Sequence, residues 1–420
     1  MRLFFCTCLP LLAVLSCTSF ESSEIDCSGF QDDKFYVDLA STACSEYNSF
    51  FHLKTKSGDI PVVDANGIIP LGRDSSLYVV NFCDNKGYVV ISSDLERPLT
   101  YVASASGFFD GSTTGVQPID YCLSLLTSET HEIDSPSPDT KAPVRIQRQF
   151  DTTVFIDTFC EPLCSVEWHQ EAPFNNQCPT FFDVHSPAGC VPIAIAQAMS
   201  CFEYPQTIRI EDFNGGDILN LDWAQMKDPI HSGLHFGSCQ YCESNAYLLG
   251  WIGQLCNAQY NIDRTDVGID DALRALSYLG YRCYMPVIYD IDYLFSSCSS
   301  GYPSLLFAIN SGDVSGHCWL VDGTHHYKLY RSIQKRQLSG SFEGVWTDDG
   351  FESDERWYLH FNYGYGGANN VYFLAKWDYI GDGTLFASNH VTRNVSIFSG
   401  GDPQVPNESV HIITHIRPSL

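Results

Sequence analysis

The sequence predicts an α+β protein built from two successive blocks, each with a core of its own. In the second block, segments with helical periodicity come first and strand-like segments follow, which is the order typical of an α+β domain. The chain has 420 residues, of which 44% are hydrophobic and 17% charged. It is therefore long enough for two globular domains and too apolar for a disordered protein.

The N-terminus has the pattern of an export signal. Arg2 is followed by an apolar run over residues 3–15, which is too short to remain in a bilayer as a spanning helix. Val14–Cys17 resembles a bacterial lipoprotein signal, in which Cys17 becomes the lipidated first residue; ordinary signal-peptidase cleavage nearby is the alternative. We therefore expect residues 1–16 to be a signal peptide and the protein to be an outer-membrane or cell-surface lipoprotein, or otherwise secreted.

Charge and cysteine content narrow the class of protein further. The 50 acidic and 23 basic side chains give a net charge of −27, which argues against a nucleic-acid partner because phosphate binding needs clustered Lys and Arg. Acidity of this size favours solubility outside the cytoplasm. The 18 cysteines show no repeating spacing, so their pairing cannot be deduced, and we expect most of them to be small hydrophobic residues.

The first block contains short strand-like segments separated by turns. Residues 84–87 form a predicted turn between segments 77–82 and 88–92, which indicates a β-hairpin. Further strand-like segments are 50–53 and 60–63, and residues 117–126 are a predicted helix. No catalytic cluster stands out in this block.

A polar stretch rich in serine and proline, Ser135–Pro143, separates the two blocks and should be an exposed linker. Lys141, Arg145 and Arg148 lie in or just after it, in a chain otherwise poor in cations. An exposed basic linker is a candidate for proteolytic cleavage, and a plain tether between domains is the alternative.

The second block starts near Phe150 and contains the predicted helices and the later strands. One predicted helix starts at Cys190 and stops near Tyr204, and an amphipathic helix over 270–279 ends at Gly280. The other predicted elements are a helix over 246–259 and strands over 304–309, 317–322, 357–362 and 371–374.

Cys190 stands where the chain changes from loop to helix. Pro187 and Gly189 are loop residues, and Pro192 suits the first turn of a helix, where its missing N–H is not needed. Free N–H groups and the dipole at a helix N-terminus lower the pKa of a thiol and favour the thiolate, which is the nucleophile. A buried structural cysteine is the alternative, but the loop-to-helix setting favours a nucleophile.

A nucleophilic cysteine needs an acid/base partner, and His317 is the best placed of the 13 histidines. It begins a predicted strand after the turn at 312–316 and lies 127 positions after Cys190. That is close to the separation of about 130–150 positions in papain-like enzymes. His325 and His326 lie on a polar turn and are expected at the surface.

Five motifs occur along the chain in a fixed order. They are Gly87–Asp94 with Arg97–Leu99, Trp168–Asn175 with Cys178-Pro179, Gly189–Met199 with Tyr204-Pro205, Gly316-His317 with Val321–Gly323, and His360–Gly367. Together they resemble the streptopain-like cysteine peptidases, a branch of the papain-like clan. Any one of these motifs is weak, but five in order are a strong match that covers nearly the whole mature chain.

The resemblance implies a papain-like catalytic domain, with a helical part and an antiparallel sheet, preceded by a small α+β inhibitory propeptide domain. It implies that Cys190 is the nucleophile and His317 its acid/base partner. Gln170 is the implied side-chain donor to the oxyanion, alongside the backbone N–H of Cys190. Asn362 is the implied residue that orients the imidazole, and His360, on the same strand face, is expected to be a core histidine.

Gly316, Tyr363 and Tyr365 are the implied substrate-binding residues, with Tyr363 packing over the Cys–His pair. The family usually has tryptophans at the two tyrosine positions, so we expect weaker shielding of the pair and altered subsites. The predicted histidine and asparagine of the site are 45 positions apart. Much of that stretch, Lys328–Asp354, is interpreted as an inserted surface loop.

The resemblance also implies a domain organisation and a set of partners. We expect residues 17–145 to form the propeptide domain and its linker, and residues 146–420 to form the peptidase domain. The partners would be protein or peptide substrates and the chain's own propeptide. The protein would contact a membrane only through the lipid anchor. No cofactor is expected.

One constellation falls outside the family pattern. His231, His235, Cys239 and Cys242 have the ligand types and a spacing like that of a zinc site. Neighbouring glycines make this stretch a flexible loop, and it matches no named zinc motif. Loop residues or a local disulfide are the favoured alternatives.

The sequence therefore predicts an exported cysteine endopeptidase that is made as a zymogen and acts through a thioester acyl-enzyme. Two alternatives stay open. One is an acyl transferase that uses the same Cys–His pair. The other is a catalytically weak or inactive homologue that acts as a surface binding protein, since a fold does not guarantee a function.

Overall fold

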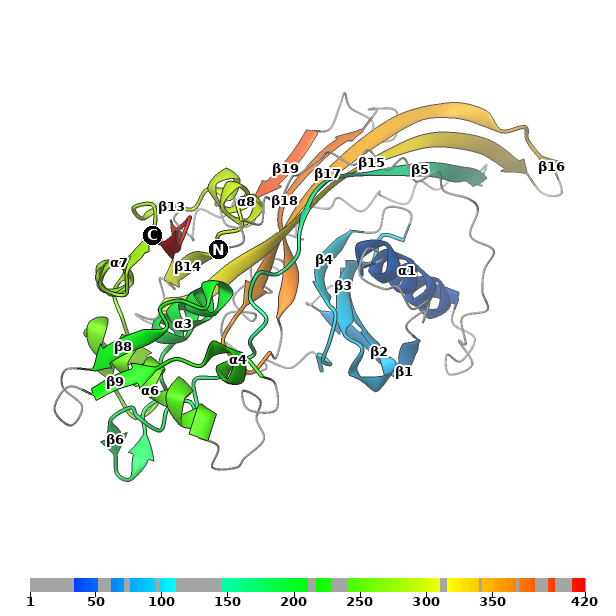
Figure 1. Cartoon of the computed structure of the whole chain (residues 1–420). Helices are drawn as coiled ribbons and strands as arrows, with labels where there is room; N and C mark the ends of the chain where they lie inside the picture. Colours follow the sequence, from blue (N-terminus) through cyan, green and yellow to red (C-terminus); the bar gives the residue numbers. More distant parts are fainter. Residues whose placement is uncertain are drawn as a thin grey trace.

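The computed structural model describes most of the chain between residues 34 and 419, and Figure 1 shows its arrangement. The described residues are 34–51, 62–71, 76–95, 99–110, 145–210, 217–228, 240–309, 316–339, 342–367, 370–381, 392–396 and 410–419. The predicted signal peptide, Cys17, the helix at 117–126 and the linker Ser135–Pro143 lie outside them, as do His231, His235 and Cys239 and the side chain of Cys242. None of the described helices is long and apolar enough to cross a membrane.

In its described residues, the N-terminal unit has one helix packed on a four-stranded antiparallel sheet. Helix α1 (Lys34–Phe51) buries a stripe at helical spacing that runs from Leu39 to Phe51. The sheet has the order β1 (Val63–Leu71), β2 (Leu77–Phe82), β3 (Tyr88–Ser92) and β4 (Thr100–Ser104). The strand-like prediction for residues 50–53 was wrong at Phe50 and Phe51, which end α1.

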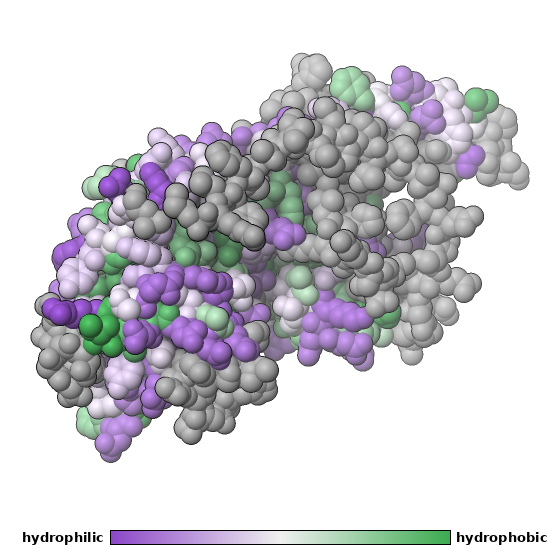
Figure 2. Space-filling model, viewed as in Figure 1, coloured by the Kyte–Doolittle hydropathy of each residue, from purple (hydrophilic) through white to green (hydrophobic). Residues whose placement is uncertain are grey.

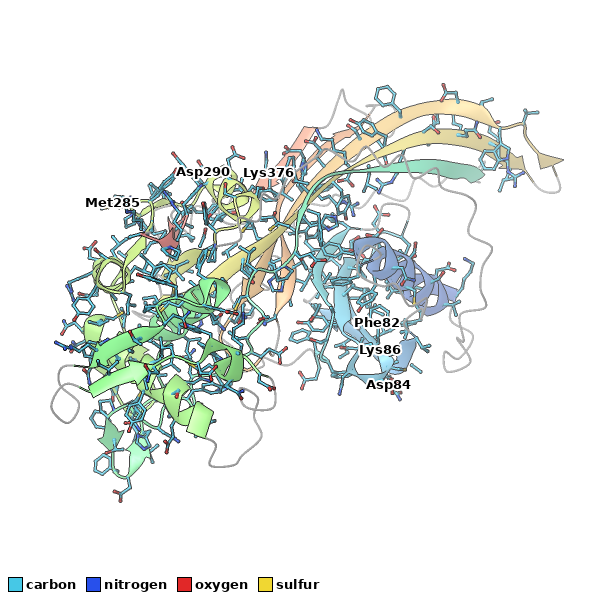
Figure 3. The ribbon with its side chains drawn as sticks, viewed as in Figure 1. Phe82, Asp84, Lys86, Met285, Asp290 and Lys376 are labelled. Atoms are coloured by element: carbon cyan, nitrogen blue, oxygen red, sulfur yellow. The ribbon has the colours of Figure 1, made fainter. Side chains whose placement is uncertain are left out.

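The predicted hairpin of the first block is present. Strands β2 and β3 pair in antiparallel register from Asn81 opposite Tyr88 to Leu77 opposite Ser92. A short 3-10 turn (η1, Cys83–Asn85) joins them, and Figure 3 labels Asp84 and Lys86 at this end of the unit. The short apolar runs on both sides of a turn that contains Asn85 and Gly87 explain why the sequence alone predicts this element.

The helical lobe of the second block carries the predicted nucleophile helix at its centre. Helix α3 (Cys190–Phe202) buries every residue from Val191 to Ser200. The other helices are α4 (Trp223–Met226), α6 (Gln240–Leu255), α7 (Ile269–Tyr278) and α8 (Ile291–Ser299). The short strands of this lobe are β6 (Thr180–Phe181), β7 (Val184–His185), β8 (Thr207–Ile210), β9 (Asp217–Asn220), β10 (Gln259–Tyr260), β11 (Thr265–Asp266) and β12 (Tyr281–Arg282).

Both blocks share one antiparallel sheet. Its order is β1-β2-β3-β4-β18-β17-β15-β14-β20-β13, so the N-terminal unit joins the second block where β4 pairs with β18. The strands of the second block are β13 (Val287–Ile288), β14 (Ser304–Ile309), β15 (Gly316–Ser339), β16 (Phe342–Glu343), β17 (Thr347–Asn362), β18 (Val371–Gly381), β19 (Thr392–Ser396), β20 (Val410–Ile413) and β21 (Arg417–Pro418). The helix-then-sheet order predicted for this block is confirmed.

The stretch Lys328–Asp354 is not the surface loop that the sequence suggested. It is the outer part of β15 and β17, which extend together as a long curved ribbon with β5 (Arg145–Cys160) as a third strand (Figure 1). Its charged residues pair across the strands: Arg331 lies 3.1 Å from Glu352, and Lys335 is paired with Asp349. The stretch resembled a surface loop in composition because the charged residues that form these cross-strand ion pairs are frequent in it.

His325 and His326 are in the middle of β15 and not on a surface turn. Their side chains are only 2% and 6% exposed. The ring of His326 stacks on Trp357 at 4.5 Å between centroids, and that of His325 lies 4.8 Å from Phe50 of α1. The prediction was wrong because β15 continues straight through the polar segment.

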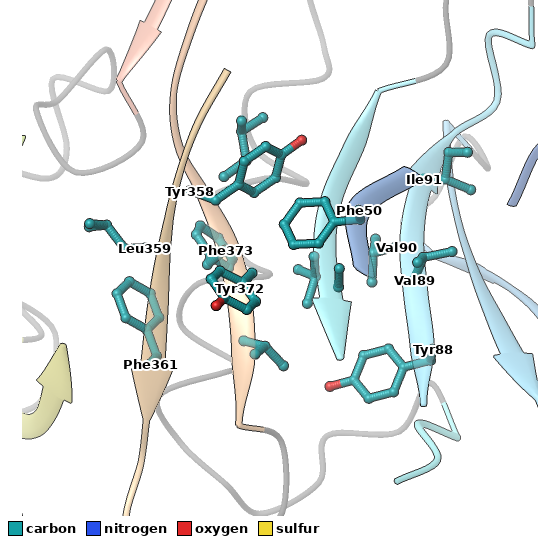
Figure 4. Packing of buried hydrophobic residues seen from close by; sticks show 14 of the residues in the cluster. Phe50, Tyr88, Val89, Val90, Ile91, Tyr358, Leu359, Phe361, Tyr372 and Phe373 are labelled. Atoms are coloured by element: carbon teal, nitrogen blue, oxygen red, sulfur yellow. The ribbon is translucent and has the colours of Figure 1, made fainter. Parts of the chain in front are cut away.

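Two apolar clusters fill the interior. One joins the N-terminal unit to one face of the large sheet, and Figure 4 shows part of it between β3 and β17. The other packs α3, α6 and α7 against the opposite face of β14 and β15. The face of the molecule in Figure 2 shows many hydrophilic residues with smaller apolar patches between them, as the acidic composition suggests.

Candidate active site

Cys190 is the first residue of α3, as the loop-to-helix pattern predicts. The preceding Gly189 has φ +97°, and a Cβ there would lie 2.9 Å from Cγ2 of Thr265. Thr265 Oγ1 also donates a hydrogen bond to the carbonyl of Pro187 at 2.6 Å. Glycine is therefore needed here, because the loop must turn in a left-handed conformation directly against Thr265.

The thiol of Cys190 lies among backbone N–H groups. Burial raises the pKa of this thiol, and hydrogen bonds from the backbones of Cys318, Val191 and Cys190 itself oppose the rise. The contact with Cys318 places the thiol beside the residue that follows His317 in β15. The structure therefore places the Cys190 thiol where α3 meets the start of β15, against the residue next to His317.

His317 stands near the beginning of β15, on a face lined by aromatic rings. Its ring lies 5.8 Å from that of Tyr365 and 6.2 Å from that of Trp319, nearly parallel to both. Burial lowers the pKa of His317 to about 4, and a hydrogen bond to the backbone of Tyr363 only partly opposes this. Burial therefore favours the neutral form of both groups.

Gln170 lies beside this pair on the segment that precedes α3. Its side chain is 8% exposed, and its carbonyl accepts the N–H of Ala188 at 2.8 Å. Its Nε2 is buried and has no hydrogen-bond acceptor within the described part of the chain. Burial raises the pKa of the Tyr365 hydroxyl to about 12, and the Gln170 side chain opposes this rise. The amide therefore lies close to Tyr365.

Asn362 does not contact His317 in the way that the resemblance implies. It pairs with Leu320 in the β15–β17 register, so its side chain points to the face opposite that of His317. Its Oδ1 accepts from Gln197 Nε2 at 2.8 Å, and its Nδ2 donates to the carbonyl of Val166 at 3.0 Å. Asn362 thus ties β17 to α3, and the backbone of Tyr363 holds the imidazole instead.

The three predicted substrate-binding residues differ in exposure. Tyr363 is only 1% exposed and packs on Trp319 in the core, so its side chain is not available to a substrate. Tyr365 is half-buried against His317, and Gly316 is exposed at the start of β15. Of the two tyrosines, Tyr365 therefore has the position that the resemblance implied for both.

The glycine between these tyrosines is required by the geometry. Gly364 has φ +74°, and a Cβ there would lie 2.4 Å from Cγ2 of Ile193 in α3. Its N–H donates to Oδ1 of Asn362 at 3.2 Å. The turn that places Tyr365 beside His317 thus depends on a close approach of backbone to helix.

His360 is a core residue, as expected. Its Nδ1 lies 2.6 Å from Oδ1 of Asp322, a carboxylate with no exposed surface, and Oδ2 of Asp322 accepts the N–H of Cys164 at 2.8 Å. This pair anchors the segment that leads to Gln170. Sequence reasoning missed two groups of the site, the backbones of Cys318 and Tyr363, since backbone groups leave no signal in residue types.

A helical lobe with a cysteine at a helix N-terminus, packed on an antiparallel sheet that carries a histidine, defines the class of papain-like cysteine peptidases. Within this class, residues 168–373 match the model of the Peptidase C10 family. The recognition of a streptopain-like chain is confirmed. No curated protein matches the sequence.

Two solved structures from Prevotella intermedia are similar to this chain. A prointerpain A fragment, in a mutant form, has a TM-score of 0.50 and 16% identity, and the match covers 83% of this chain and 97% of that one. Active wild-type interpain A cysteine protease has a TM-score of 0.35 and 18% identity, with 53% and 93% covered. The match to the prointerpain A fragment confirms the predicted fold, a papain-like domain preceded by an N-terminal unit.

Proposed function

We propose that this protein is a cysteine endopeptidase made as a zymogen. The sulfur of Cys190 attacks a peptide carbonyl, His317 takes up the thiol proton and passes it to the leaving amine, and water hydrolyses the thioester. The proposal rests on one observation: the Cys190 thiol at the helix N-terminus contacts the residue next to His317. The buried Gln170 amide beside them supplies a donor for the oxyanion.

Contacts of the N-terminal unit support its role as an inhibitory propeptide. Ser104 Oγ of β4 lies between the carbonyls of Ser106 at 2.7 Å and Asn370 at 3.1 Å, and the N–H of Asn370 donates to the carbonyl of Gly367 in the turn that carries Tyr365. The hydroxyl of Tyr358 donates to the carbonyl of Thr100 at 2.7 Å. The unit therefore holds the strand and the turn that border the site.

The domain boundaries and the export route belong to the same proposal. Residues 17–145 form the propeptide and linker, residues 146–420 the peptidase, and residues 1–16 a signal peptide, with Cys17 as the lipid site of a surface lipoprotein. Because β5 begins at Arg145 and pairs with β15, a cut before it would leave the peptidase sheet intact. N-terminal sequencing of the processed protein and palmitate labelling of wild type against Cys17→Ala test these assignments.

The central experiment compares the full chain with Cys190→Ala and with Cys83→Ala as a matched cysteine control. We expect casein hydrolysis and cutting of the linker in wild type and control, and neither in Cys190→Ala. Casein hydrolysis by Cys190→Ala would overturn the proposal. Labelling by a thiol-directed peptidyl inhibitor at Cys190 separates an active peptidase from a homologue that only binds.

A further inference from the structure

The segment around Gln170 presents a row of side chains at the surface beside the candidate site. Along residues 166–171, buried and more exposed side chains alternate, with the period of an extended chain. The outward members are Glu167 and Glu171, which are exposed, and His169, which is half-buried and lies between them in sequence. The row therefore consists of a carboxylate on each side of an imidazole.

This row is joined to the turn that carries Tyr365. His169 pairs with Tyr365 in an antiparallel bridge, and the N–H of Gly366 donates to the carbonyl of Trp168 at 3.0 Å. The rings of His169 and Tyr365 are perpendicular, with 5.7 Å between their centroids. The Tyr365 ring in turn stacks 5.8 Å from that of His317. Three rings therefore form a continuous wall from the proposed acid/base residue to the row of carboxylates.

Both carboxylate residues are held next to this wall. A Cβ on Gly367 would lie 2.5 Å from Cδ and 2.8 Å from Oε1 of Glu167, so this carboxylate lies against the turn, two residues after Tyr365. The N–H of Glu171 donates to Nδ1 of His169 at 2.9 Å, which fixes Glu171 beside the imidazole. Within the described part of the chain, neither carboxylate is paired with a Lys or Arg side chain. Their negative charge is therefore free to meet a ligand.

The ring between the carboxylates does not cancel their charge. Nδ1 of His169 accepts a hydrogen bond, and burial lowers the pKa of this ring, so it is neutral near pH 7. Asp266, whose neighbour in sequence packs on Gly189, is already paired with Arg264 at 3.2 Å. The uncompensated charge thus lies on the Tyr365 side of the site. Carboxylates next to aromatic rings attract an ammonium or a guanidinium group, through ion pairing and through cation–π contact.

The direction of the reaction tells which part of a substrate meets this wall. His317 passes its proton to the leaving amine, so the substrate residue that supplies the amine lies next to His317. We propose that Glu167 and Glu171, with the rings of His169 and Tyr365, bind the cationic side chain of that residue. Given the proposed peptidase function, on which this proposal rests, the preferred substrates carry Lys or Arg directly after the scissile bond.

The precursor contains a peptide of this chemistry in its own linker. Lys141 is the one Lys or Arg of Ser135–Pro143, so Thr140–Lys141 is the linker bond that this subsite selects. Arg145, the next cationic residue, already belongs to β5, where it pairs with Leu338. A preference for a cation after the scissile bond would therefore direct self-processing to a position before the peptidase sheet.

The first test measures kcat/KM of the processed enzyme on three quenched fluorescent peptides. They share the sequence around the casein bond that the enzyme cuts best and carry Lys, Gln or Glu directly after that bond. We expect the Lys peptide to be cut about five- to ten-fold faster than the Gln peptide, and the Glu peptide to be the slowest. High salt should reduce the advantage of Lys. Equal rates would overturn the subsite and leave the proposed peptidase standing, whereas hydrolysis of none of the peptides, nor of casein, would overturn both.

The second test assigns the preference to the two carboxylates. In the double variant Glu167→Gln, Glu171→Gln, the ratio of the Lys rate to the Gln rate should fall towards one. Asp183→Asn is the control: this exposed carboxylate is in the turn between β6 and β7, at a φ of +64° that asparagine also adopts, and its removal should retain the ratio. Hydrolysis of the Gln peptide shows that each variant is folded. A Lys preference that persists in the double variant would refute the assignment.

Discussion

The imidazole of His317 is hydrogen-bonded to the backbone of Tyr363, while the side chain of Asn362, one residue earlier, points to the other face of the sheet. The side chain that the resemblance assigned to orienting the histidine is therefore used elsewhere. A backbone carbonyl can hold the ring equally well, and it cannot be removed by substitution. Loss of Asn362 should consequently affect stability more than the acid/base chemistry.

Asn362→Ala should lower the free energy of unfolding by about 2–4 kcal/mol, because it leaves the buried amide of Gln197 and the carbonyl of Val166 without their partner. Denaturant unfolding measures this. Asn245→Ala is the control, since that buried asparagine makes a single bond of 3.4 Å to the carbonyl of Met226. A variant that unfolds like wild type but has a shifted pH–rate profile would show instead that Asn362 acts on His317.

The second prediction concerns the stability of the precursor at acid pH. Burial lowers the pKa of His317 from 6.5 to about 4, so the unfolded chain binds the proton more tightly than the folded chain. The stability from the neutral ring is complete above pH 6.5 and is lost as the pH falls through that value towards 4. The loss amounts to about 3 kcal/mol.

The measurement is the unfolding free energy of the Cys190→Ala precursor between pH 7 and pH 4, with and without His317→Gln. The carboxylates contribute to both curves, so the difference between them isolates this histidine. Parallel curves for the parent and His317→Gln would mean that the ring is not buried in its neutral form.

The third prediction tests how the N-terminal unit is held. The ring of Phe50 lies 4.8 Å from the rings of both His325 and Tyr358 and 5.3 Å from that of Tyr372, so one side chain of α1 fills an aromatic site in the second block. Phe50→Ala should remove this contact and make precursor processing several-fold faster. The appearance of the mature band in a time course measures it.

Phe35→Ala is the matched control for Phe50→Ala. Phe35 is also on α1, but its ring contacts Tyr36 and Tyr78 of its own unit. The Phe35→Ala substitution should weaken the N-terminal unit without removing the aromatic contact to the second block. Equal acceleration by both variants would indicate that processing depends on the stability of the unit and not on its attachment through Phe50.

Residues whose local pattern agreed with the fold could be predicted from the sequence. The turn between β2 and β3 and the loop before Cys190 carry glycine or proline where the backbone requires it, and they are found as expected. The ribbon of β15 and β17 was missed because its charges pair across strands that are distant in sequence. Helix α1 ends in Phe50 and Phe51, whose strand-like propensity tertiary packing overrides.

In the candidate site too, some residues could be predicted from the sequence and others could not. Position along the chain and residue type point to Cys190 and His317, and the family resemblance adds Gln170; these assignments stay predictions. The assignment of Asn362 required knowing which face of β17 it occupies, and that is set by its register with Leu320. A single-residue difference in register exchanges the two faces of a strand, and no sequence pattern near Asn362 reports it.

The last prediction concerns the turn between the two tyrosines. Gly364→Ala would place a Cβ 2.4 Å from Cγ2 of Ile193 and force an unfavourable positive φ. The turn should move away from α3 and carry Tyr365 off the ring of His317, with a loss of about 1–3 kcal/mol in stability and a larger fractional loss in kcat/KM. Unfolding curves and peptide hydrolysis by the processed enzyme measure the two effects.

A second substitution separates the two causes of that loss. Ile193→Ala removes the Cγ2 atom that the new methyl group would meet at 2.4 Å and leaves the Cβ at 3.4 Å, while the strained φ of residue 364 remains. In the double variant the turn can return to its place, so kcat/KM should recover further than stability does. If the double variant is no more active than Gly364→Ala alone, the approach of this turn to α3 does not position Tyr365, and the backbone conformation by itself accounts for the requirement for glycine.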